Sequence, residues 1–285
     1  MQAAQNTKID PVCGMNLAEL ADAKEAIHHG RTFYFCGEYC AERFVKNPEK
    51  FVGEPLIRLK EIWKIFRLGA VNVEVLKDLD LNIWDGDFVA IIGASGSGKS
   101  TALNMLGLLD RPTSGKIILG GQDVSLLKDE EKAELRSKTF GFVFQQYNLI
   151  PWLTAHENVT LPMMFAKKSI DGERLKANFR EIGLEGRMAH RPLELSGGEQ
   201  QRGAILRALT NNPEIILADE PTGNLDSTTG NKILEILANL NKTHKKTLIV
   251  VTHDADIAAK ADQVVTLKDG RLVRNHQIHK EIYTE

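Results

Sequence analysis

Long apolar runs are missing from this chain of 285 residues. The best candidate, Phe88–Ala94, has the length of a strand, whereas a helix that spans a bilayer needs roughly 18 apolar residues. We therefore expect no membrane-spanning segment. The first residues also lack the basic start and apolar core of a signal peptide, which predicts a cytoplasmic protein.

A charge excess is missing as well, since 36 Lys and Arg residues stand against 38 Asp and Glu residues. Nucleic-acid-binding proteins usually carry a basic excess or a basic stripe, so we expect no nucleic-acid partner. Aromatic residues make up 6% and hydrophobic residues 42%, which is typical of a folded globular protein. At roughly 150 residues per domain, the length predicts one large domain or one large and one small.

Cysteine is scarce, and all three cysteines, Cys13, Cys36 and Cys40, fall in the first forty residues. This clustering indicates a separate unit with its own use for thiols. The composition changes near Gly53, from a segment dense in Cys, His and aromatic residues to one typical of α/β proteins. We expect an N-terminal domain over residues 8–53, a large domain over 56–275 and a tail over 276–285.

The large domain alternates apolar runs with helical patterns. Phe88–Ile92, Glu214–Ala218 and Thr247–Thr252 are strand-like, and Ala204–Asn211 has helical periodicity. The pattern predicts an α/β fold with a largely parallel sheet covered by helices.

A phosphate-binding loop follows the first of these strands. Residues 93–101 read Gly-Ala-Ser-Gly-Ser-Gly-Lys-Ser-Thr and precede the apolar helical run Ala102–Leu106. The glycines let backbone N–H groups point at phosphate oxygens, and the N-terminus of the helix adds its positive dipole end. Lys99 supplies a positive charge for the β- and γ-phosphates and Ser100 a hydroxyl for Mg²⁺. A turn that bound nothing would need neither residue.

Two adjacent acids, Asp219 and Glu220, end the run that begins at Ile215. Carboxylates at the carboxyl end of a strand lie where α/β sheets bind ligands. Asp219 would help hold the metal, and Glu220 could orient or deprotonate a water that attacks the γ-phosphate. Alone, the pair would be a solvated strand end, but the upstream phosphate-binding loop favours the catalytic interpretation.

Residues 195–202, Leu-Ser-Gly-Gly-Glu-Gln-Gln-Arg, resemble the signature sequence of ATP-binding cassette (ABC) ATPases. Further motifs follow the order of that family over about residues 56–275. Phe66 resembles the aromatic position that stacks on adenine, where tyrosine is more usual; Gln145 resembles the Q-loop glutamine, residues 223–226 the D-loop and His253 the switch histidine. The resemblance implies a P-loop NTPase ABC cassette with a mixed sheet core plus a helical subdomain.

The resemblance also implies the residues of the site. Glu220, His253, Lys99 and Gln145 would be catalytic, and Mg²⁺ would be held by Ser100, Gln145 and Asp219. Two cassettes would dimerise head to tail, each signature contacting the ATP of its partner. The implied ATP-binding residues are Phe66, Gly93, Ala94, Ser95, Gly96, Ser97, Gly98, Lys99, Ser100 and Thr101, joined from the partner subunit by Ser196, Gly197, Gly198 and Glu199.

Several segments of the sequence are similar to those of the lipoprotein-release and macrolide-export subfamily (LolD and MacB types). The resemblance implies a separate permease of the FtsX/MacB type and a place on the cytoplasmic face of the inner or plasma membrane. Asn148–Thr160, with Trp152, would belong to the groove that receives the permease, although Trp152 could equally pack in the core. Only 50 residues separate Gln145 from the signature, too few for a coiled-coil insertion of the DNA-repair branch.

The N-terminal segment looks like a YHS domain, a small α+β module found beside heavy-metal transport proteins. If residues 37–44 are helical, Cys36 and Cys40 lie one turn apart, and Cys13 need only fold over them. Three thiolates favour Cu(I) or Zn(II), with Met15, His28 or His29 as a fourth ligand. The alternative is that the thiols are inert core residues of a docking domain.

Together these features predict an ATP-hydrolysing subunit that dimerises and powers a separate permease for lipoprotein, peptide, drug or metal-linked cargo. Two alternatives stay open. The cassette could regulate a metal-responsive partner and transport nothing, or the N-terminal module could deliver metal to a transporter as cargo.

Overall fold

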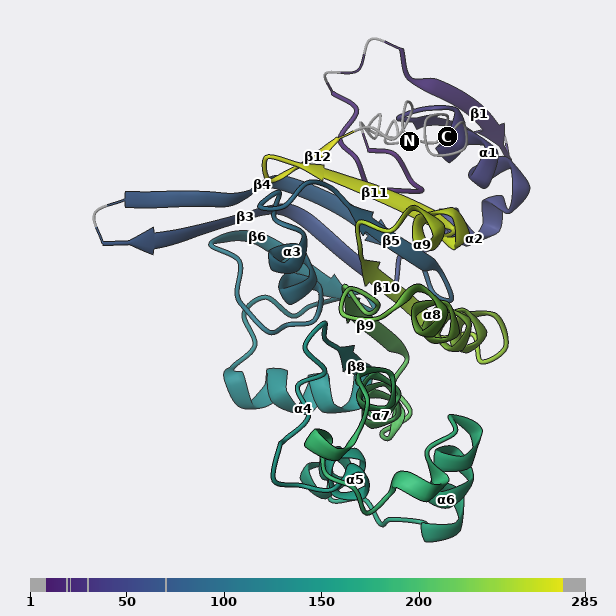
Figure 1. Ribbon diagram of the computed structural model, residues 1–285. Coiled ribbons are helices and arrows are strands. Elements are labelled where there is room, and N and C mark those ends of the chain that lie inside the picture. The colour runs from purple at the N-terminus through teal and green to yellow at the C-terminus, as the bar shows by residue number, and fades with distance from the viewer. Residues whose placement is uncertain (1–8, 19, 21, 30, 70, 274–285) are drawn as a thin grey trace. The chain divides into compact units, whose positions relative to one another are not determined.

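The computed structural model describes residues 9–18, 20, 22–29, 31–69 and 71–273, so the expected tail over 276–285 lies outside the described residues. The chain forms two compact units, which we describe separately (Figure 1). Unit 1 comprises Met1–Asp85, Ile92–Leu126 and Val264–Glu285. Unit 2 comprises Gly86–Ile91 and Leu127–Gln263.

Unit 1 contains a four-stranded antiparallel sheet with the strand order β4-β3-β6-β7. Its two long strands form a hairpin (Figure 1) in which Ile57 pairs with Ile83 and Leu68 with Val71. The prediction of a largely parallel sheet missed these strands. The elements are β3 (Ile57–Leu68), β4 (Val71–Ile83), α3 (Lys99–Leu106), β6 (Ser114–Leu119), β7 (Gln122–Asp123) and the antiparallel pair β11 (Gln263–Lys268) and β12 (Arg271–Val273).

The N-terminal module of unit 1 is an α+β fold, as predicted. An antiparallel hairpin precedes two helices, and the first helix includes the predicted helical residues 37–44 except its N-cap, Gly37. A buried cluster around Phe35 and Phe44 forms the core of the module. The elements are β1 (Lys24–His28), β2 (Arg31–Phe35), α1 (Glu38–Lys46) and α2 (Pro48–Val52).

The module is packed against the end of β4. Trp84 directly follows β4, is 3% exposed and belongs to the same buried cluster as the three cysteines. Its Nε1 donates to the carbonyl of Val12 at 2.8 Å, and its ring meets Phe51 edge to face at 5.2 Å. The N–H of Asn82 donates to the carbonyl of Cys13 at 2.8 Å. Trp84, at the end of β4, therefore belongs to the core of the module.

Unit 2 contains the parallel strands, in the order β5-β10-β9-β8. The predicted runs at 88–92, 214–218 and 247–252 all form strands, with bounds that shift by at most one residue. Residues of three helices join the buried strand residues in one apolar core. The elements are β5 (Phe88–Ile92, with Ile92 in unit 1), β8 (Phe140–Val143), α7 (Gly197–Leu209), β9 (Ile215–Asp219), α8 (Ser227–Lys242), β10 (Thr247–Val251) and α9 (Ala255–Lys260).

The rest of unit 2 is helical, as the fold prediction required. A second buried cluster includes Val159, Phe179 and Leu206 and joins this part to α7. The side chain of Asn158, fully buried, bonds four backbone groups between residues 150 and 154 and fixes the entry to its helix. The elements are α4 (Asp129–Thr139), α5 (Ala155–Phe165), α6 (Gly172–Glu181), η1 (Glu185–Arg187) and η2 (Pro192–Glu194).

Within the described part of the chain, every helix is too short or too polar to cross a bilayer.

Candidate functional site

The phosphate-binding loop forms as predicted between β5 and α3. Gly93, Gly96 and Gly98 all have positive φ angles, and Gly98 is the left-handed N-cap of α3. A Cβ atom on Gly98 would lie 2.8 Å from the carbonyl oxygen of Val75, so no larger residue fits there. Lys99 Nζ donates to the carbonyls of Gly93 at 2.8 Å and Ala94 at 3.0 Å. The loop thus places a positive charge beside the N-terminus of a helix, which suits a phosphate.

The carboxylate pair of unit 2 lies at the carboxyl end of β9, beside the end of β10. Asp219 ends β9, and Glu220 follows with a left-handed φ of 45°. His253 Nδ1 lies 2.9 Å from Glu220 Oε1, although 33 residues separate them. An unusual backbone angle at a polar residue of a strand end is a frequent feature of functional sites. The structure therefore brings together two of the predicted catalytic side chains.

Gln145 lies next to the predicted D-loop of unit 2. Its backbone carbonyl accepts a hydrogen bond from Asn224 Nδ2 at 2.9 Å. A Cβ atom on Gly223 would lie 3.0 Å from Gln145 Nε2, so this glycine allows the close approach. Gln145, the D-loop and the Glu220 turn are connected, because the N–H of Gly223 donates to the carbonyl of Glu220 at 3.1 Å.

The signature residues open α7, a helix of 13 residues. Ser196 is its N-cap, and the Ser196 hydroxyl accepts a hydrogen bond from the N–H of Glu199 at 3.3 Å. The Glu199 carboxylate in turn accepts from the N–H of Ser196 at 2.8 Å and from Arg187 Nε at 3.0 Å. The hydrogen bond from the N–H of Ser196 above all, together with the bond from Arg187, holds the pKa of Glu199 below its usual range. Glu199 therefore fixes the cap residue, whereas Gly197 and Gly198 start the helix beside it.

Comparison with known proteins agrees with this geometry. Residues 76–223 match the family described as ABC transporter. The chain belongs to the ABC transporter family. An uncharacterized ABC transporter ATP-binding protein of Thermotoga maritima is 48% identical over 221 residues, which cover 76% of this chain and 93% of that protein. The cassette is therefore an ATP-hydrolysing enzyme of the ABC type.

Two further relatives place the cassette among MacB-type proteins. The macrolide export ATP-binding/permease protein MacB of Wolinella succinogenes is 47% identical over 226 residues, which cover 79% of this chain but only 35% of MacB. The dimeric post-hydrolysis structure of the cassette MJ0796 of Methanocaldococcus jannaschii, bound to ADP and Pi, matches with a TM-score of 0.72 and 46% identity. This match covers 76% of the present chain and 97% of MJ0796.

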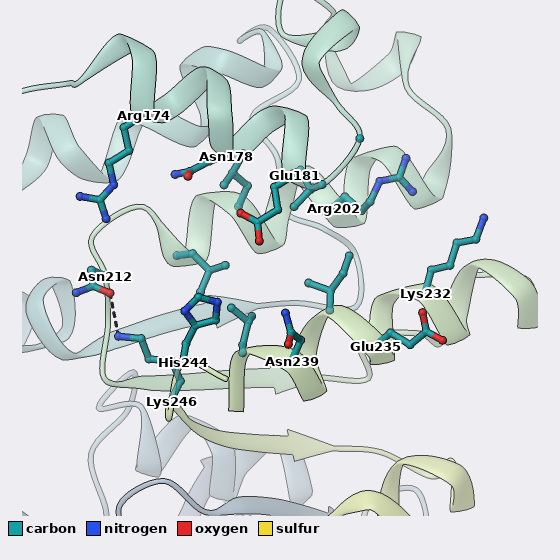
Figure 2. A pocket seen from close by; sticks show the side chains of 16 residues that line it. Arg174, Asn178, Glu181, Arg202, Asn212, Lys232, Glu235, Asn239, His244 and Lys246 are labelled. Atoms are coloured by element: carbon teal, nitrogen blue, oxygen red, sulfur yellow. Dashed lines mark hydrogen bonds between the residues drawn. The ribbon is translucent and has the colours of Figure 1, made fainter. Parts of the chain in front are cut away.

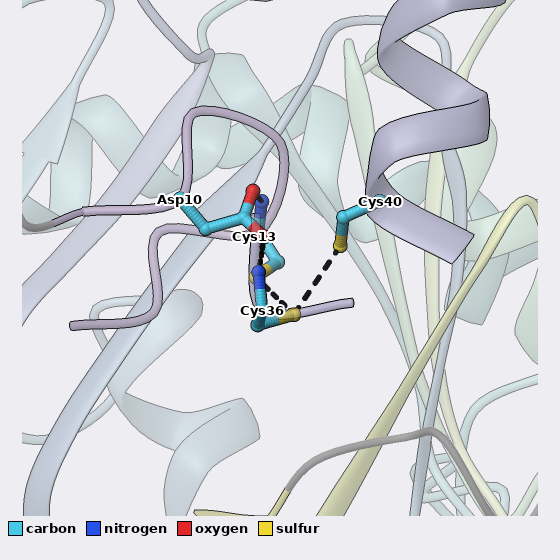
Figure 3. A group of neighbouring side chains, drawn as sticks. All are labelled: Asp10, Cys13, Cys36 and Cys40. Carbon is cyan, nitrogen blue, oxygen red and sulfur yellow. Dashed lines mark hydrogen bonds between the residues drawn. The ribbon is translucent and has the colours of Figure 1, made fainter. Parts of the chain in front are cut away.

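The N-terminal module of the cassette is a YHS domain, matched over residues 8–54. Its three thiols meet in a buried group (Figure 3): Cys13 Sγ lies 3.7 Å from Cys36 Sγ, which lies 3.6 Å from Cys40 Sγ. Hydrogen bonding to Cys36 and Cys40 raises the pKa of the Cys13 thiol well above its ordinary value, and burial adds a smaller contribution.

Asp10 is the residue that sequence reasoning missed in this module. It is completely buried, and its carboxylate lies among the thiols (Figure 3). Oδ1 accepts from the N–H groups of Val12 at 2.8 Å and Cys13 at 3.3 Å, and Oδ2 from the N–H of Cys36 at 2.7 Å. Burial, with Cys36 beside it, raises the pKa of Asp10 to about 7. An acid three residues before a cysteine was the available signal in the sequence.

Two of the expected fourth ligands lie elsewhere. His28 and His29 form a separate group with Glu49, so the structure does not place them with the thiols. Met15, by contrast, packs against the cysteine cluster.

Trp152 is 72% exposed, so the alternative that it packs in the core is wrong. At the C-terminal end of α5, Met164 and Phe165 are 65% and 77% exposed. A groove of about 410 Å³ in unit 2 includes Phe142, Phe144 and Phe165 among its lining residues. Exposed apolar side chains around a groove are typical of interaction sites.

A second cavity of unit 2, of about 790 Å³, lies between α6, α7 and α8 (Figure 2). Its polar rim includes Arg174, Lys232 and Lys246, and Lys246 Nζ donates to Asn212 Oδ1 at 2.9 Å. None of the predicted ATP-binding or catalytic residues lines it. The cavity is therefore separate from the predicted nucleotide site.

Proposed function

We propose that this cassette binds MgATP with its phosphate-binding loop, dimerises through its signature helix and powers a separate membrane permease. The observation that carries the proposal is the contact between Glu220 and His253 at the strand ends. In this proposal, Glu220 orients or deprotonates the attacking water, and His253 holds the Glu220 carboxylate and senses the γ-phosphate. Bound Mg²⁺ supplies positive charge to the phosphates when held by Ser100, Gln145 and Asp219.

Dimerisation is supported by the first turn of α7. In the proposal, Ser196, Gly197 and Gly198 bind the γ-phosphate of ATP on the partner subunit, since the N-terminus of a long helix is an anion site. Glu199 acts by holding Ser196 in place. MJ0796, which is similar over most of the cassette, is dimeric in a structure with ADP and Pi. In the proposal, Phe66 of β3 stacks on adenine, and residues 93–101 surround the phosphates.

The test is Glu220→Gln, with Glu214→Gln as a matched control at the opposite end of β9. We expect the first variant to lose at least about a hundredfold in ATP turnover, because a positioned base contributes that much. It should also elute as a dimer when loaded with MgATP. The control should keep the turnover of the wild type. Unchanged turnover in Glu220→Gln would overturn the catalytic assignment.

The separate permease is supported by the groove and the exposed side chains of α5. A helix from a permease of the FtsX/MacB type would lay its apolar face there. MacB itself combines ATP-binding and permease parts, and the present chain spans about a third of its length. In cells, we expect Phe165→Asp to move the cassette from the membrane fraction to the supernatant without changing the ATPase rate of the purified chain. Unchanged membrane association would contradict this surface.

We further propose that the thiols of the YHS domain bind Zn(II) or Cu(I). A tetrahedral zinc with Zn–S bonds of 2.3 Å needs sulfur atoms about 3.8 Å apart. The observed separations of 3.7 and 3.6 Å are close to that value. In this proposal the cysteines are the ligands, and Asp10 holds the backbone of Cys13 and Cys36 as an outer partner, because its oxygens already accept three N–H groups.

Metal analysis of anaerobically purified protein tests this proposal. We expect near-stoichiometric zinc or copper in the wild type and none in the Cys36→Ser/Cys40→Ser variant. Metal absent from both, even after reconstitution, would leave the thiols as inert core residues of a docking domain.

A regulatory function is the second candidate. It is favoured by two hydrogen bonds: the carbonyl of Val12 accepts from Trp84, and the carbonyl of Cys13 accepts from Asn82. Metal binding at Cys13 would then be communicated to β4. The ATPase rate with and without added zinc, in the wild type and in the double cysteine variant, separates this function from metal delivery. A rate that responds to zinc only in the wild type would support regulation.

A further inference from the structure

A second cluster of metal-ligating side chains lies on the surface of the YHS domain. His28 ends β1, His29 follows it, and Glu49 comes from the first turn of α2. His28 Nε2 lies 3.0 Å and His29 Nε2 lies 3.2 Å from the same oxygen, Glu49 Oε1. The three ligand atoms all lie within 4.8 Å of one another.

The backbone at His29 produces this convergence. Successive side chains of a strand point to opposite faces, so two adjacent histidines would normally diverge. His29 instead has a left-handed φ of 47°, which is uncommon for a residue other than glycine. Its ring lies 4.1 Å from the ring of His28, centroid to centroid. The turn therefore presents both imidazoles on one side.

The spacing fits a divalent cation. Bonds of 2.0–2.2 Å to nitrogen and oxygen in a tetrahedron place the ligand atoms about 3.3–3.5 Å apart. The two distances to Glu49 are within a few tenths of an ångström of that range. A cation would replace the protons that the two Nε2 atoms now donate to the carboxylate. These donated hydrogen bonds, from His29 first, already hold the pKa of Glu49 below its usual range.

We propose that His28, His29 and Glu49 form a surface site for a divalent first-row cation of the Zn(II) class, with water as the fourth ligand. Imidazole and carboxylate are borderline or hard ligands, unlike the soft thiols of the buried group. The proposal is thus independent of the thiol site. His28, whose side chain is 19% exposed, packs edge to face on Phe44 at 5.9 Å and gives the site one fixed wall.

An ion pair alone is a weaker explanation of the cluster. The side chains of Glu49 and His29 are 73% and 77% exposed, and exposed ion pairs contribute little to stability. Stability therefore gives no reason to hold two imidazoles on one carboxylate oxygen, whereas a shared cation does.

The test uses the full chain with Cys13→Ser, Cys36→Ser and Cys40→Ser, so that the thiols cannot compete. A calorimetric titration with Zn(II) in excess Mg²⁺ should give one site per chain. Adding His29→Gln or Glu49→Gln should weaken that site by about tenfold or more, at least the effect of losing an outer partner. His244→Gln, another exposed histidine, is the matched control and should leave the affinity unchanged.

Should the triple serine variant fail to fold, the wild-type chain gives the same answer with Co(II). The second equivalent should produce d–d bands without the sulfur-to-cobalt charge-transfer bands of the first, and His29→Gln should abolish it. Zinc affinity that is the same in His29→Gln, Glu49→Gln and the control would overturn the proposal and leave a surface ion pair.

Discussion

The phosphate-binding loop and the thiol group of the YHS domain offer opposite kinds of binding group. In the loop, backbone N–H groups and the ammonium of Lys99 would bind phosphate, and Ala94, Ser95 and Gly96 are exposed. In the thiol group, the three cysteine side chains are buried. The loop offers donors to an anion, whereas a metal bound by the thiols, as we propose, would have to replace their protons. The loop would thus take its ligand without losing a proton, whereas the proposed metal would complete the thiol group.

The difference extends to what supports each site. Glycine conformations shape the loop, whereas the thiol group depends on Asp10 and on a wall contributed by Trp84. Substitutions should thus act mainly on chemistry in the first site and mainly on local stability in the second.

Trp84→Ala should have the largest effect, about 3–5 kcal/mol, because it removes a buried indole and the bond to Val12. Hydrogen exchange of residues 9–53, read by mass spectrometry, should speed up accordingly. Trp152→Ala is the matched control, since Trp152 is 72% exposed, and should change protection little. Equal effects of the two would mean that the module does not depend on β4.

Lys99→Met should lower kcat/KM for ATP by about 10²–10³-fold, the usual loss when one donor to a developing charge is removed. The folded structure should be unchanged, because Lys99 Nζ donates to two carbonyls of its own loop, those of Gly93 and Ala94. Lys116→Met on β6, an exposed lysine, should leave turnover at the wild-type value. A comparable loss in both variants would point to a general charge effect.

Asp10→Ala should destabilise the YHS domain by about 2–3 kcal/mol, because buried N–H groups of Val12, Cys13 and Cys36 lose their acceptor. The rate at which a thiol reagent modifies the three cysteines reports local opening and should increase. Asp22→Ala, an exposed acid of the same module, should not change that rate. Thiols that stay equally protected in Asp10→Ala would show that Asp10 does not hold the group together.

Phe66→Ala should have the smallest effect, about 1 kcal/mol or a several-fold weaker ATP affinity, as expected for one lost stacking partner. Phe66 is 39% exposed on the β3–β4 hairpin, and Lys64 Nζ lies 4.8 Å from its ring centroid. Phe66→Tyr should bind ATP as the wild type does, because the ring face remains. Fluorescent-nucleotide titration compares the three proteins, and a loss in Phe66→Tyr would argue against stacking.

Contiguous features were predictable from the sequence. The loop at residues 93–101 and strands β5, β9 and β10 are continuous segments whose pattern is local, so their structure agrees with the prediction. The antiparallel sheet has a signal too, since β3 begins with alternating apolar and charged residues from Ile57 to Lys60. The prediction of a largely parallel sheet did not include this strand.

Sites assembled from distant segments were not predictable in the same way. The thiol group joins a turn, a strand end and a helix, so the sequence gives its cysteines but not the carboxylate of Asp10. The sequence offers His28 and His29 as possible fourth ligands of that group. The left-handed turn at His29 and the contact with Glu49, about twenty residues away, depend on how the hairpin packs against α2.

The close fit of the YHS domain on β4 restricts how anything can reach the cysteines. At Gly14, whose φ is 83°, a Cβ atom would lie 2.8 Å from the backbone nitrogen of Asn82, so the chain beside Cys13 touches β4 directly. If the thiols bind a metal as proposed, a domain held at this turn and at Trp84 would not act as a tethered carrier arm. A donor or acceptor of that metal would instead have to dock on a composite surface made of both the YHS domain and the antiparallel sheet.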